Sequence, residues 1–532
     1  MANVRRDVWK LPPGDKTLEW YGKAVGVLQS RPISDVTSWW SLGAMHGIDL
    51  QIWQGFGFIN NGTPLPPPNI QRTLWRQCQH LTWYFLPWHR GYLVAFERIV
   101  RDAVVKLGGP ADWALPYWNY SDSAAARELP RAFAKATLPD GSRNFLHVPQ
   151  RYGAAQVPNV QNPIVLDPRV VAVNTTLRER FFEGTSGGGS AGFGGIKTPF
   201  WHGDESNDGT FGVLETQPHG GVHVWVGGGF SGGGLSNNPL ELGLMTNPDT
   251  AAVDPIFWLH HSNIDRLWNV WLKQQRRPRD PPDTFRNPTD PDWLDGPQNR
   301  DFAMPNLDGS LYKFVARDVL DTTVPALDYV YDDDAPAAPL ESVAARLESL
   351  GASRAQAAEL EGGLAMTPPK PAELMGANLE AVQLGHDVVQ TQVRLDSGQR
   401  RELTATLESV GGAAPIKKEP DRVYLNLENI RSPSDAAMFY VYVNLPKGAD
   451  PEQYPDHFAG TLSMFGVSKA SAKQEKAGNG ITASFDITPI IDKLHMEQSL
   501  GDALSVTLKS AVPGAENSGA SIGRISVYRQ GQ

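Results

Sequence analysis

Histidines are the residues of this chain whose spacing could support chemistry. Neutral imidazoles without cysteine partners suit copper, zinc, nickel or iron, so a group of them predicts a transition-metal site. His219 and His223 are four residues apart, and on a helix both side chains would project from one face toward one ion. His261 and Asp265 have the same spacing. Seven of the twelve histidines form three groups: His46; His80 and His89; and His219, His223, His260 and His261.

His80 and His89 need a break in the chain if they are to meet. They are nine residues apart, which would place them on opposite sides of an unbroken helix. Pro87 lies between them. We expect one helix to end near Leu86 and the next to begin there, so that the two imidazoles converge.

A hydrogen-bonded core residue is the ordinary alternative for any single histidine on an apolar helix. Here five histidines lie in bulky apolar segments flanked by tryptophans. Burying that many imidazoles without partners would cost about 1–3 kcal/mol apiece, and a metal removes that cost. The clusters therefore favour ligation. We expect the other histidines to be solvated or locally bonded: His147, His202, His386, His457 and His495.

Length and charge limit the function classes. The 532 residues predict roughly two to four domains. A net charge of −10 without a basic block argues against a nucleic-acid or anionic-membrane partner. No run approaches about 18 apolar residues, the length that spans a membrane, and the N-terminus has no apolar signal core. We therefore expect a cytoplasmic protein. The single cysteine, Cys78, excludes an intramolecular disulfide.

Tryptophan usage marks a domain boundary. All sixteen tryptophans lie between Trp9 and Trp293. Residues 1–331 contain long apolar segments that predict buried helices. Residues 332–380 are acidic and rich in alanine and proline, which predicts a linker with one helix. Residues 381–532 contain period-two runs between turn residues, which predict an antiparallel β-sandwich.

Three segments resemble the copper-binding signatures of the tyrosinase, catechol oxidase and mollusc haemocyanin superfamily. They are "HLTWYFLPWHRGYLVAFE" (80–97), "PHGGVHVW" (218–225) and "DPIFWLHHSNIDRLW" (254–268). The resemblance implies a four-helix bundle with a binuclear type 3 site, in which two copper ions lie about 3.5–4 Å apart. It implies O2 as co-substrate and a small phenol as substrate. The implied ligands are His46, His80 and His89 for one copper and His219, His223 and His261 for the other, with His260 and Asp265 as neighbours.

The same resemblance implies oxidation of o-diphenols to o-quinones. Glu215 stands where plant-type enzymes carry a glutamate that holds a water. Gly220 replaces the asparagine that follows the histidine in hydroxylating relatives, which favours diphenols or o-aminophenols over monophenols. Pro248 falls at the gate above the first copper, where plant enzymes often have phenylalanine. A haemocyanin-like reversible O2 carrier is the alternative function.

The C-terminal half resembles that of plant polyphenol oxidases, on "MFYVYVNLP", "HFAGTLSMF" and "SFDITPIIDKL". This implies a latent proenzyme whose C-terminal domain covers the copper site with one side chain, Phe465 or Met464. Cys78 precedes His80 by two residues. Fungal tyrosinases and mollusc haemocyanins have Cys-x-His at this place with a thioether bond to the ring, so the resemblance implies a Cys78–His80 thioether.

Overall fold

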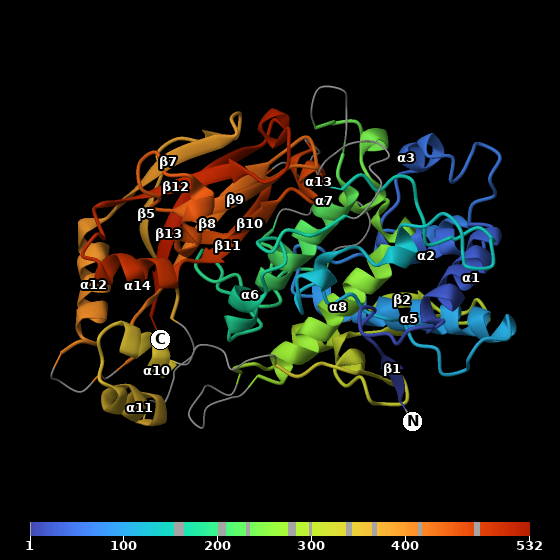
Figure 1. Cartoon of the computed structure of the whole chain (residues 1–532), viewed down its shortest axis with the longest axis horizontal. Coiled ribbons are helices and arrows are strands. Elements are labelled where there is room, and N and C mark those ends of the chain that lie inside the picture. Colours follow the sequence, from blue (N-terminus) through green and yellow to red (C-terminus); the bar gives the residue numbers. More distant parts are fainter. Residues whose placement is uncertain are drawn as a thin grey trace.

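The chain folds into a mainly helical half and a half built on one β-sheet, which lie side by side (Figure 1). The computed structural model describes residues 2–153, 164–200, 209–229, 235–274, 283–296, 301–336, 343–363, 370–412, 416, 418–472 and 479–531. We call the part up to residue 336 the helical half and the part from residue 370 the sheet half. Helices α10 (Val343–Ser349) and α11 (Arg354–Gly363) lie between them in the sequence.

The helical half contains two long helices, α5 (Phe85–Lys106) and α8 (Ile256–Leu272), surrounded by shorter elements. The shorter helices are α1 (Thr17–Ser30), α2 (Trp39–His46), α3 (Leu50–Gly55), α4 (Pro68–Leu74), α6 (Asn174–Arg178), α7 (Gly221–Gly227) and α9 (Pro291–Asp295). Strand β1 (Asn3–Arg5) pairs in parallel with β4 (Tyr329–Tyr331), and β2 (Phe302–Pro305) pairs with β3 (Leu311–Phe314).

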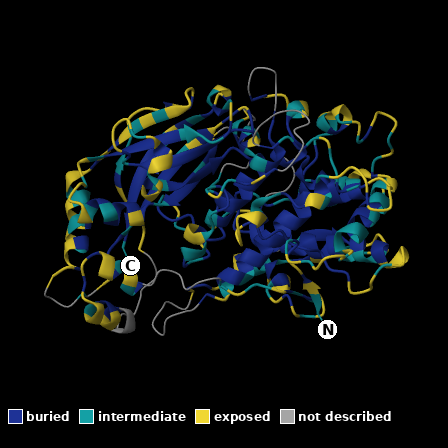
Figure 2. Ribbon diagram, in the orientation of Figure 1, coloured by how far each residue is buried: buried dark blue, intermediate teal, exposed yellow. Residues whose placement is uncertain are grey.

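Bulky aromatic side chains hold α5 and α8 together. Both helices are buried over most of their length, and Figure 2 shows them inside the helical half. Phe96 of α5 stacks on Trp258 of α8 with ring centroids 3.4 Å apart. Burying rings of this size is the largest source of apolar stabilisation that a helix pair can gain. The packing of these rings therefore holds α5 against α8.

The sheet half forms one continuous nine-stranded sheet in the described residues. The strand order is β10-β9-β12-β7-β5-β13-β8-β11, with β6 beside β13. The strands are β5 (Glu373–Ala377), β6 (Val382–Gln383), β7 (Val388–Leu395), β8 (Arg422–Arg431), β9 (Met438–Val443), β10 (Phe458–Ser463), β11 (Ile481–Asp486), β12 (Ala503–Ser510) and β13 (Ser521–Gln530). The end strands β10 and β11 come into contact, so the sheet is nearly a closed barrel.

The predicted β-sandwich is not confirmed, because the strands join one sheet rather than two packed layers. Alternation of apolar and polar residues is common to sandwiches and barrels, so the sequence pattern could not separate them. Strand β5 lies inside the predicted linker and pairs with β13 and β7, so the sheet begins at residue 373. Helices α12 (Ser397–Glu408) and α14 (Thr488–Met496) contact each other at the end of the sheet far from the helical half (Figure 1), and α13 (Val467–Ser471) packs against β8.

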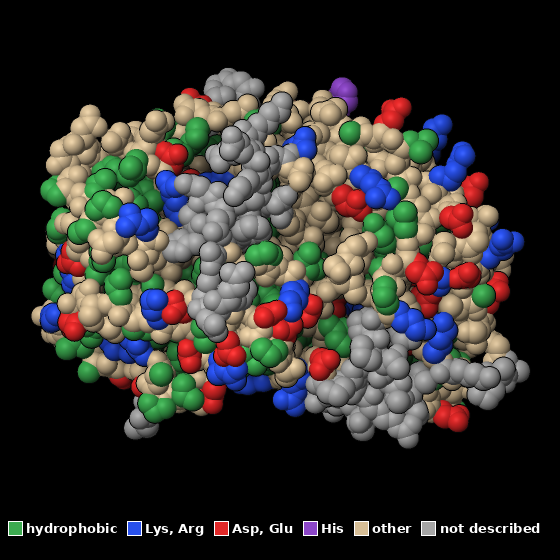
Figure 3. Space-filling model, turned by 180° about the vertical axis from the view of Figure 1, so that it is seen from behind, with side chains coloured by type: hydrophobic (Ala, Val, Ile, Leu, Met, Phe, Trp, Pro, Cys, Tyr) green, Lys and Arg blue, Asp and Glu red, His purple; other side chains and the backbone are tan. Residues whose placement is uncertain are grey.

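Backbone and ionic contacts join the two halves. Phe211 N–H donates to the Thr482 carbonyl at 3.1 Å, and Thr482 N–H donates to the Gly209 carbonyl at 2.9 Å. Arg180 and Glu419 form a buried ion pair at 2.7 Å. Seen from behind, acidic and basic side chains are interspersed over the described part of the surface (Figure 3).

A buried ionic network around Asp265 joins four elements of the helical half. Asp265 of α8 accepts hydrogen bonds from Arg90 of α5 (2.6 Å), from Arg5 of β1 (3.3 Å) and from the hydroxyls of Tyr329 and Tyr331 of β4 (both 2.6 Å). Burial alone would raise the pKa of Asp265, but the two guanidinium groups outweigh it and hold the pKa below its ordinary value. One carboxylate thus ties together β1, β4, α5 and α8.

We expect Asp265→Asn to lower the free energy of unfolding by about 3–5 kcal/mol, because Arg5 and Arg90 would share a buried site with less compensating charge. Denaturant unfolding monitored by circular dichroism measures this change. Asp295→Asn is the matched control: it breaks an exposed pair with Arg317, and the unfolding midpoint should stay where it is. Equal midpoints for the two variants would contradict the central role of Asp265.

Candidate metal centre

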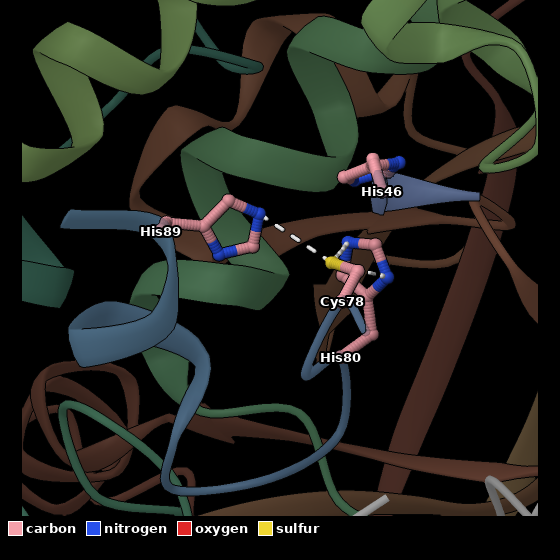
Figure 4. Close-up of side chains that lie close together, drawn as sticks. All are labelled: His46, Cys78, His80 and His89. Carbon is pink, nitrogen blue, oxygen red and sulfur yellow. Dashed lines mark hydrogen bonds between the residues drawn. The ribbon is translucent and has the colours of Figure 1, made fainter. Parts of the chain in front are cut away.

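The first histidine cluster joins three segments that are far apart in the sequence. His46 ends α2, His80 lies in the irregular segment between α4 and α5, and His89 lies near the start of α5. With Cys78 they form a group whose possible ligand atoms all lie within 4.8 Å of one another. Figure 4 shows the Cys78 sulfur between the rings of His80 and His89, with His46 nearby.

The second cluster contains His219, His223, His260 and His261, whose possible ligand atoms also lie within 4.8 Å of one another. His219 lies in the helical turn Glu215–Gly220 (η3), His223 in α7, and the other two in α8. All four are buried. The Nε2 atoms of His223 and His261 are 3.2 Å apart, so two ring nitrogens point at one small volume.

The two clusters face each other. The rings of His89 and His261 stack with centroids 4.4 Å apart and planes 9° from parallel. The ring centroids of His80 and His219 are 5.6 Å apart. Two adjoining groups of imidazoles suit two metal ions that act on one substrate.

Backbone carbonyls fix which ring nitrogen is available to a metal. Because a carbonyl can only accept a hydrogen bond, the Nδ1 atom that contacts it carries the proton and Nε2 keeps its lone pair. The four contacts are His46 to Pro248 (2.8 Å), His89 to Phe85 (2.7 Å), His219 to Glu215 (3.3 Å) and His223 to Met245 (2.9 Å). The Nε2 atoms of His46 and His219 are buried without a hydrogen-bond partner among the described residues, as expected of groups that bind a metal.

All six predicted ligands have lowered pKa values. Burial lowers the pKa of His46 to about 3. Burial, followed by repulsion from neighbouring histidines, lowers the pKa of the other five well below the ordinary value: His80, His89, His219, His223 and His261. The rings are therefore neutral at neutral pH, and a transition metal does not have to displace protons from them.

His260 and His261 differ in their surroundings. The Nδ1 atom of His260 lies 3.3 Å from the Tyr120 hydroxyl, and its ring stacks on His219 with centroids 5.6 Å apart. His261 instead directs Nε2 toward His223. The Nε2 atom of His260 is likewise buried without a hydrogen-bond partner among the described residues, so the contact with His223 is what distinguishes His261. Asp265 is held by the ionic network described above, one turn beyond His261.

The local backbone differs from the predicted helix at His80. His80 is not helical: α5 begins only at Phe85, Pro87 lies in its first turn, and Leu81 adopts a left-handed φ of 61°. His219 and His223 lie on one helical stretch, because Gln217, the non-helical residue of η3 at φ −150° and ψ 125°, precedes both of them. Sequence spacing therefore predicted the convergence of His80 and His89, but not of His219 and His223, through the wrong local structure. The four-helix bundle is not confirmed in detail.

Glu215 and Pro248 both support histidines. The Glu215 carboxylate accepts hydrogen bonds from Leu81 N–H at 3.0 and 3.2 Å, while its backbone carbonyl contacts His219. Burial raises the pKa of Glu215 well above its ordinary value. Pro248 uses its carbonyl to hold His46, a role that the sequence pattern does not reveal.

Phe465 of the sheet half reaches the histidines. Its ring stacks on His223 with centroids 4.0 Å apart and planes 15° from parallel, and lies 5.5 Å from the rings of both His80 and His219. Met464 is fully buried, and its N–H donates to the carbonyl of Ala437 in the sheet half. Of the two predicted covering residues, the described contacts place Phe465 against the clusters.

One histidine outside the clusters and two aromatic residues beside them also make defined contacts. His457 is locally bonded as expected, through Nδ1 to the Val443 carbonyl at 2.8 Å, and His202 lies outside the described residues. Tyr120 and Phe257 were not singled out from the sequence. The Phe257 ring lies 4.1 Å from that of His261, and its place four residues before His261 on one helix face is the signal that could have identified it.

Comparisons with known proteins agree with this geometry. The family described as the common central domain of tyrosinase matches residues 36–274, and a domain of unknown function (DUF7868) matches residues 371–530. Tyrosinase HcTyr1 of Hahella sp. (strain CCB-MM4) is 32% identical over 549 residues, covering 99% of both chains. The chloroplastic polyphenol oxidase of Malus domestica is 29% identical over 438 residues, covering 81% of this chain and 64% of that protein.

Solved structures share the arrangement of a helical half and a C-terminal sheet. Latent apple tyrosinase superposes with a TM-score of 0.59 at 22% identity, covering 100% of this chain and 98% of the other. Recombinant latent aurone synthase superposes with a TM-score of 0.61 at 17% identity, covering 99% and 89%. These likenesses establish the fold.

Fold, paired histidine clusters and relatives together define a binuclear copper oxidoreductase. Its cofactors are two copper ions, and the neutral, inward-facing imidazoles provide donors that suit them. The chain belongs to the tyrosinase family. In the described residues, no helix has both the length and the apolar character needed to cross a bilayer.

The neighbouring pair in α8 allows a matched test of ligand assignment. We expect His261→Asn to lower bound copper from two ions to one per chain, because His223 and His261 aim at the same volume. His260→Asn should retain two, since its ring is hydrogen-bonded to Tyr120. Copper content by mass spectrometry, with circular dichroism as a check on folding, gives the answer. The reverse pattern would assign the ligand to His260.

Proposed function

We propose that this protein oxidises o-diphenols to o-quinones with O2, and that its sheet half keeps it latent. One copper would be held by His46, His80 and His89, and the other by His219, His223 and His261. Each diphenol loses two electrons and two protons, so two diphenols and one O2 give two quinones and two waters. The convergence of these six neutral rings in two adjoining clusters carries the proposal.

The chain itself would exclude water and orient the substrate. The copper ions, when bound, supply the redox chemistry. The clusters lie among buried aromatic side chains, including Phe85, Trp88 and Phe257, which keep bulk water away from a bound phenol. Glu215 would act near the second cluster as a carboxyl that holds a proton, since burial favours its neutral form.

The substrate class is narrowed by Gly220. A glycine there offers no side chain to help Glu215 position a water that would remove a proton from a monophenol. We therefore propose o-diphenols, with o-aminophenols as a second group, ahead of monophenols. Pro248 would leave the opening above the first copper wider than a phenylalanine would.

The substrate proposal is tested by assaying the purified, copper-loaded chain on catechol, 2-aminophenol and tyrosine side by side, before and after limited proteolysis. We expect catechol and 2-aminophenol to be oxidised and tyrosine to react at least about tenfold more slowly, the cost of a missing hydrogen-bonding group. Equal rates on tyrosine and catechol would contradict the role given to Gly220. Reversible O2 binding without quinone formation would favour the oxygen carrier.

Latency is supported by the contact between Phe465 and both clusters. An aromatic ring stacked on His223 occupies the space that the planar ring of a phenol would need. The sheet half would then act as a cover attached to the same chain, with residues 1–331 as the catalytic domain, residues 332–380 as the linker, and residues 381–532 as the cover, to which the linker adds strand β5.

Phe465→Ala should raise the oxidation of catechol by untreated full-length protein about tenfold or more, because the space next to His223 opens. Met464→Leu is the control, since it keeps volume and leaves Phe465 in place. Activity is expressed relative to the same sample after limited proteolysis. If both variants stay as inactive as the parent before proteolysis, Phe465 is not the covering residue.

We also propose a thioether between Cys78 and a ring carbon of His80. The sulfur lies 3.5 Å from Nδ1 and 3.6 Å from Nε2 of His80, the two atoms that flank Cε1 (Figure 4). Bond formation would remove one hydrogen from sulfur and one from carbon, with O2 as the oxidant. The bond would fix the His80 ring, whose segment lacks the support of a helix.

Intact-mass analysis of copper-loaded protein after exposure to O2 should show a loss of two hydrogens and no alkylation of the denatured chain. The Cys78→Ser variant should keep its full mass, which controls for oxidation elsewhere. Complete alkylation of Cys78 after exposure to copper and O2 would rule the thioether out.

A further inference from the structure

The end of β10 and the turn that follows it provide contacts that place the sheet half over the clusters. Because side chains alternate along a strand, Thr461 and Ser463 share a face, and Phe465 follows in the turn. Thr461 N–H donates to the Gln217 side-chain carbonyl at 3.0 Å, and the Thr461 hydroxyl donates to the Arg169 carbonyl at 3.2 Å. Phe465 stacks on His223. Ser463, between them, lies against Gly220.

The backbone of Gly220 does not require glycine. Its φ of −61° and ψ of −34° are ordinary helical values that any residue adopts. Glycine is disfavoured at such a position relative to alanine, so its presence needs a reason in packing. The reason must lie in the space around its Cα atom.

That space is filled by the other half of the molecule. A Cβ atom at position 220 would lie 2.4 Å from the Ser463 hydroxyl oxygen, far closer than any non-bonded contact allows. The next nearest atoms are the Glu215 carbonyl oxygen at 3.5 Å and the Ser463 Cβ at 3.7 Å, which are ordinary contacts. Within the helical half, a Cβ atom at position 220 would make only the ordinary contact with the Glu215 carbonyl oxygen. Ser463 is 5% exposed, so its hydroxyl would have to turn within a buried site to make room.

We propose that Gly220 is a socket for Ser463, and that the absence of a side chain at position 220 is what allows the sheet half to dock over the copper site. This rests on the proposed latency and adds to it a residue of the catalytic half that controls it. A side chain at position 220 fits the open form and conflicts with the covered form. The glycine that disfavours monophenols is therefore also a requirement of the cover.

The test is a double-mutant cycle on full-length, copper-loaded protein. The measured quantity is the untreated fraction, which is the rate of catechol oxidation before proteolysis divided by the rate of the same sample after limited proteolysis. Gly220→Ala should raise this fraction about five- to tenfold, and Gly220→Asn should raise it further. Ser463→Ala removes only the conflicting oxygen and leaves Cβ at its ordinary distance. In the Gly220→Ala background it should return the untreated fraction to the parental value.

Gly221→Ala is the matched control. It makes the same change at the next residue, and its Cβ would lie 2.8 Å from Val170 Cγ1, a contact wholly inside the helical half. Any increase it causes should not be reversed by Ser463→Ala. Rescue of both variants would mean that Ser463→Ala tightens the cover in general, which would overturn the socket.

Hydrogen exchange of the peptide that contains β10 gives a second measurement that does not depend on catalysis. Exchange should be faster in Gly220→Ala and return to the parental rate on adding Ser463→Ala. If the untreated parent is already fully active, latency fails, while exchange still reports on the socket. If the parent is latent and neither activity nor exchange responds to Gly220→Ala, the socket is wrong and latency stands.

Discussion

Hydrogen bonds from ring nitrogens to backbone carbonyls are the interaction on which the rest of the site depends. An imidazole binds a metal through the nitrogen that carries no proton, so each carbonyl decides the ligating atom in advance. Two of these carbonyls belong to one short loop: Met245 holds His223 of the second cluster, and Pro248 holds His46 of the first. Gly47 allows the loop to approach, since a Cβ there would lie 2.5 Å from the Pro248 oxygen.

Charged residues next to the clustered histidines align the two long helices. Arg90 follows His89 on α5, and Asp265 lies one turn beyond His261 on α8. The ion pair of Arg90 with Asp265 at 2.6 Å therefore lies close to the stack of His89 on His261 at 4.4 Å. A buried ion pair contributes little net stability compared with apolar residues of similar volume. Its direction and length, however, set the rotation of α5 against α8, and that rotation brings the rings face to face.

Much of this could be predicted from the sequence, because residue type and spacing carry the chemistry. The histidine groups and the helical and strand-rich halves have a local signal, whereas Phe465 or Met464 as a covering residue came only from the resemblance. The path of the chain at His80 does not, since the left-handed Leu81 is held by Glu215, a residue 134 positions away. The single sheet could not be separated from a sandwich because both need the same alternation. Gly220 and Ser463 gain their meaning only when the two halves meet.

The helical turn Glu215–Gly220, which carries His219, would not depend on the sheet half for its shape. The side chain of Gln217 donates from Nε2 to the carbonyls of Arg169 at 2.7 Å and Ala172 at 3.0 Å, both in the helical half. Its oxygen accepts from Thr461 of the sheet half at 3.0 Å. Departure of the sheet half would remove the last bond only, and water can replace that donor at an exposed surface. Because the two bonds inside the helical half would remain, the turn that carries His219 could keep its position if Phe465 left, and the proposed cover would then block the site without having to build it.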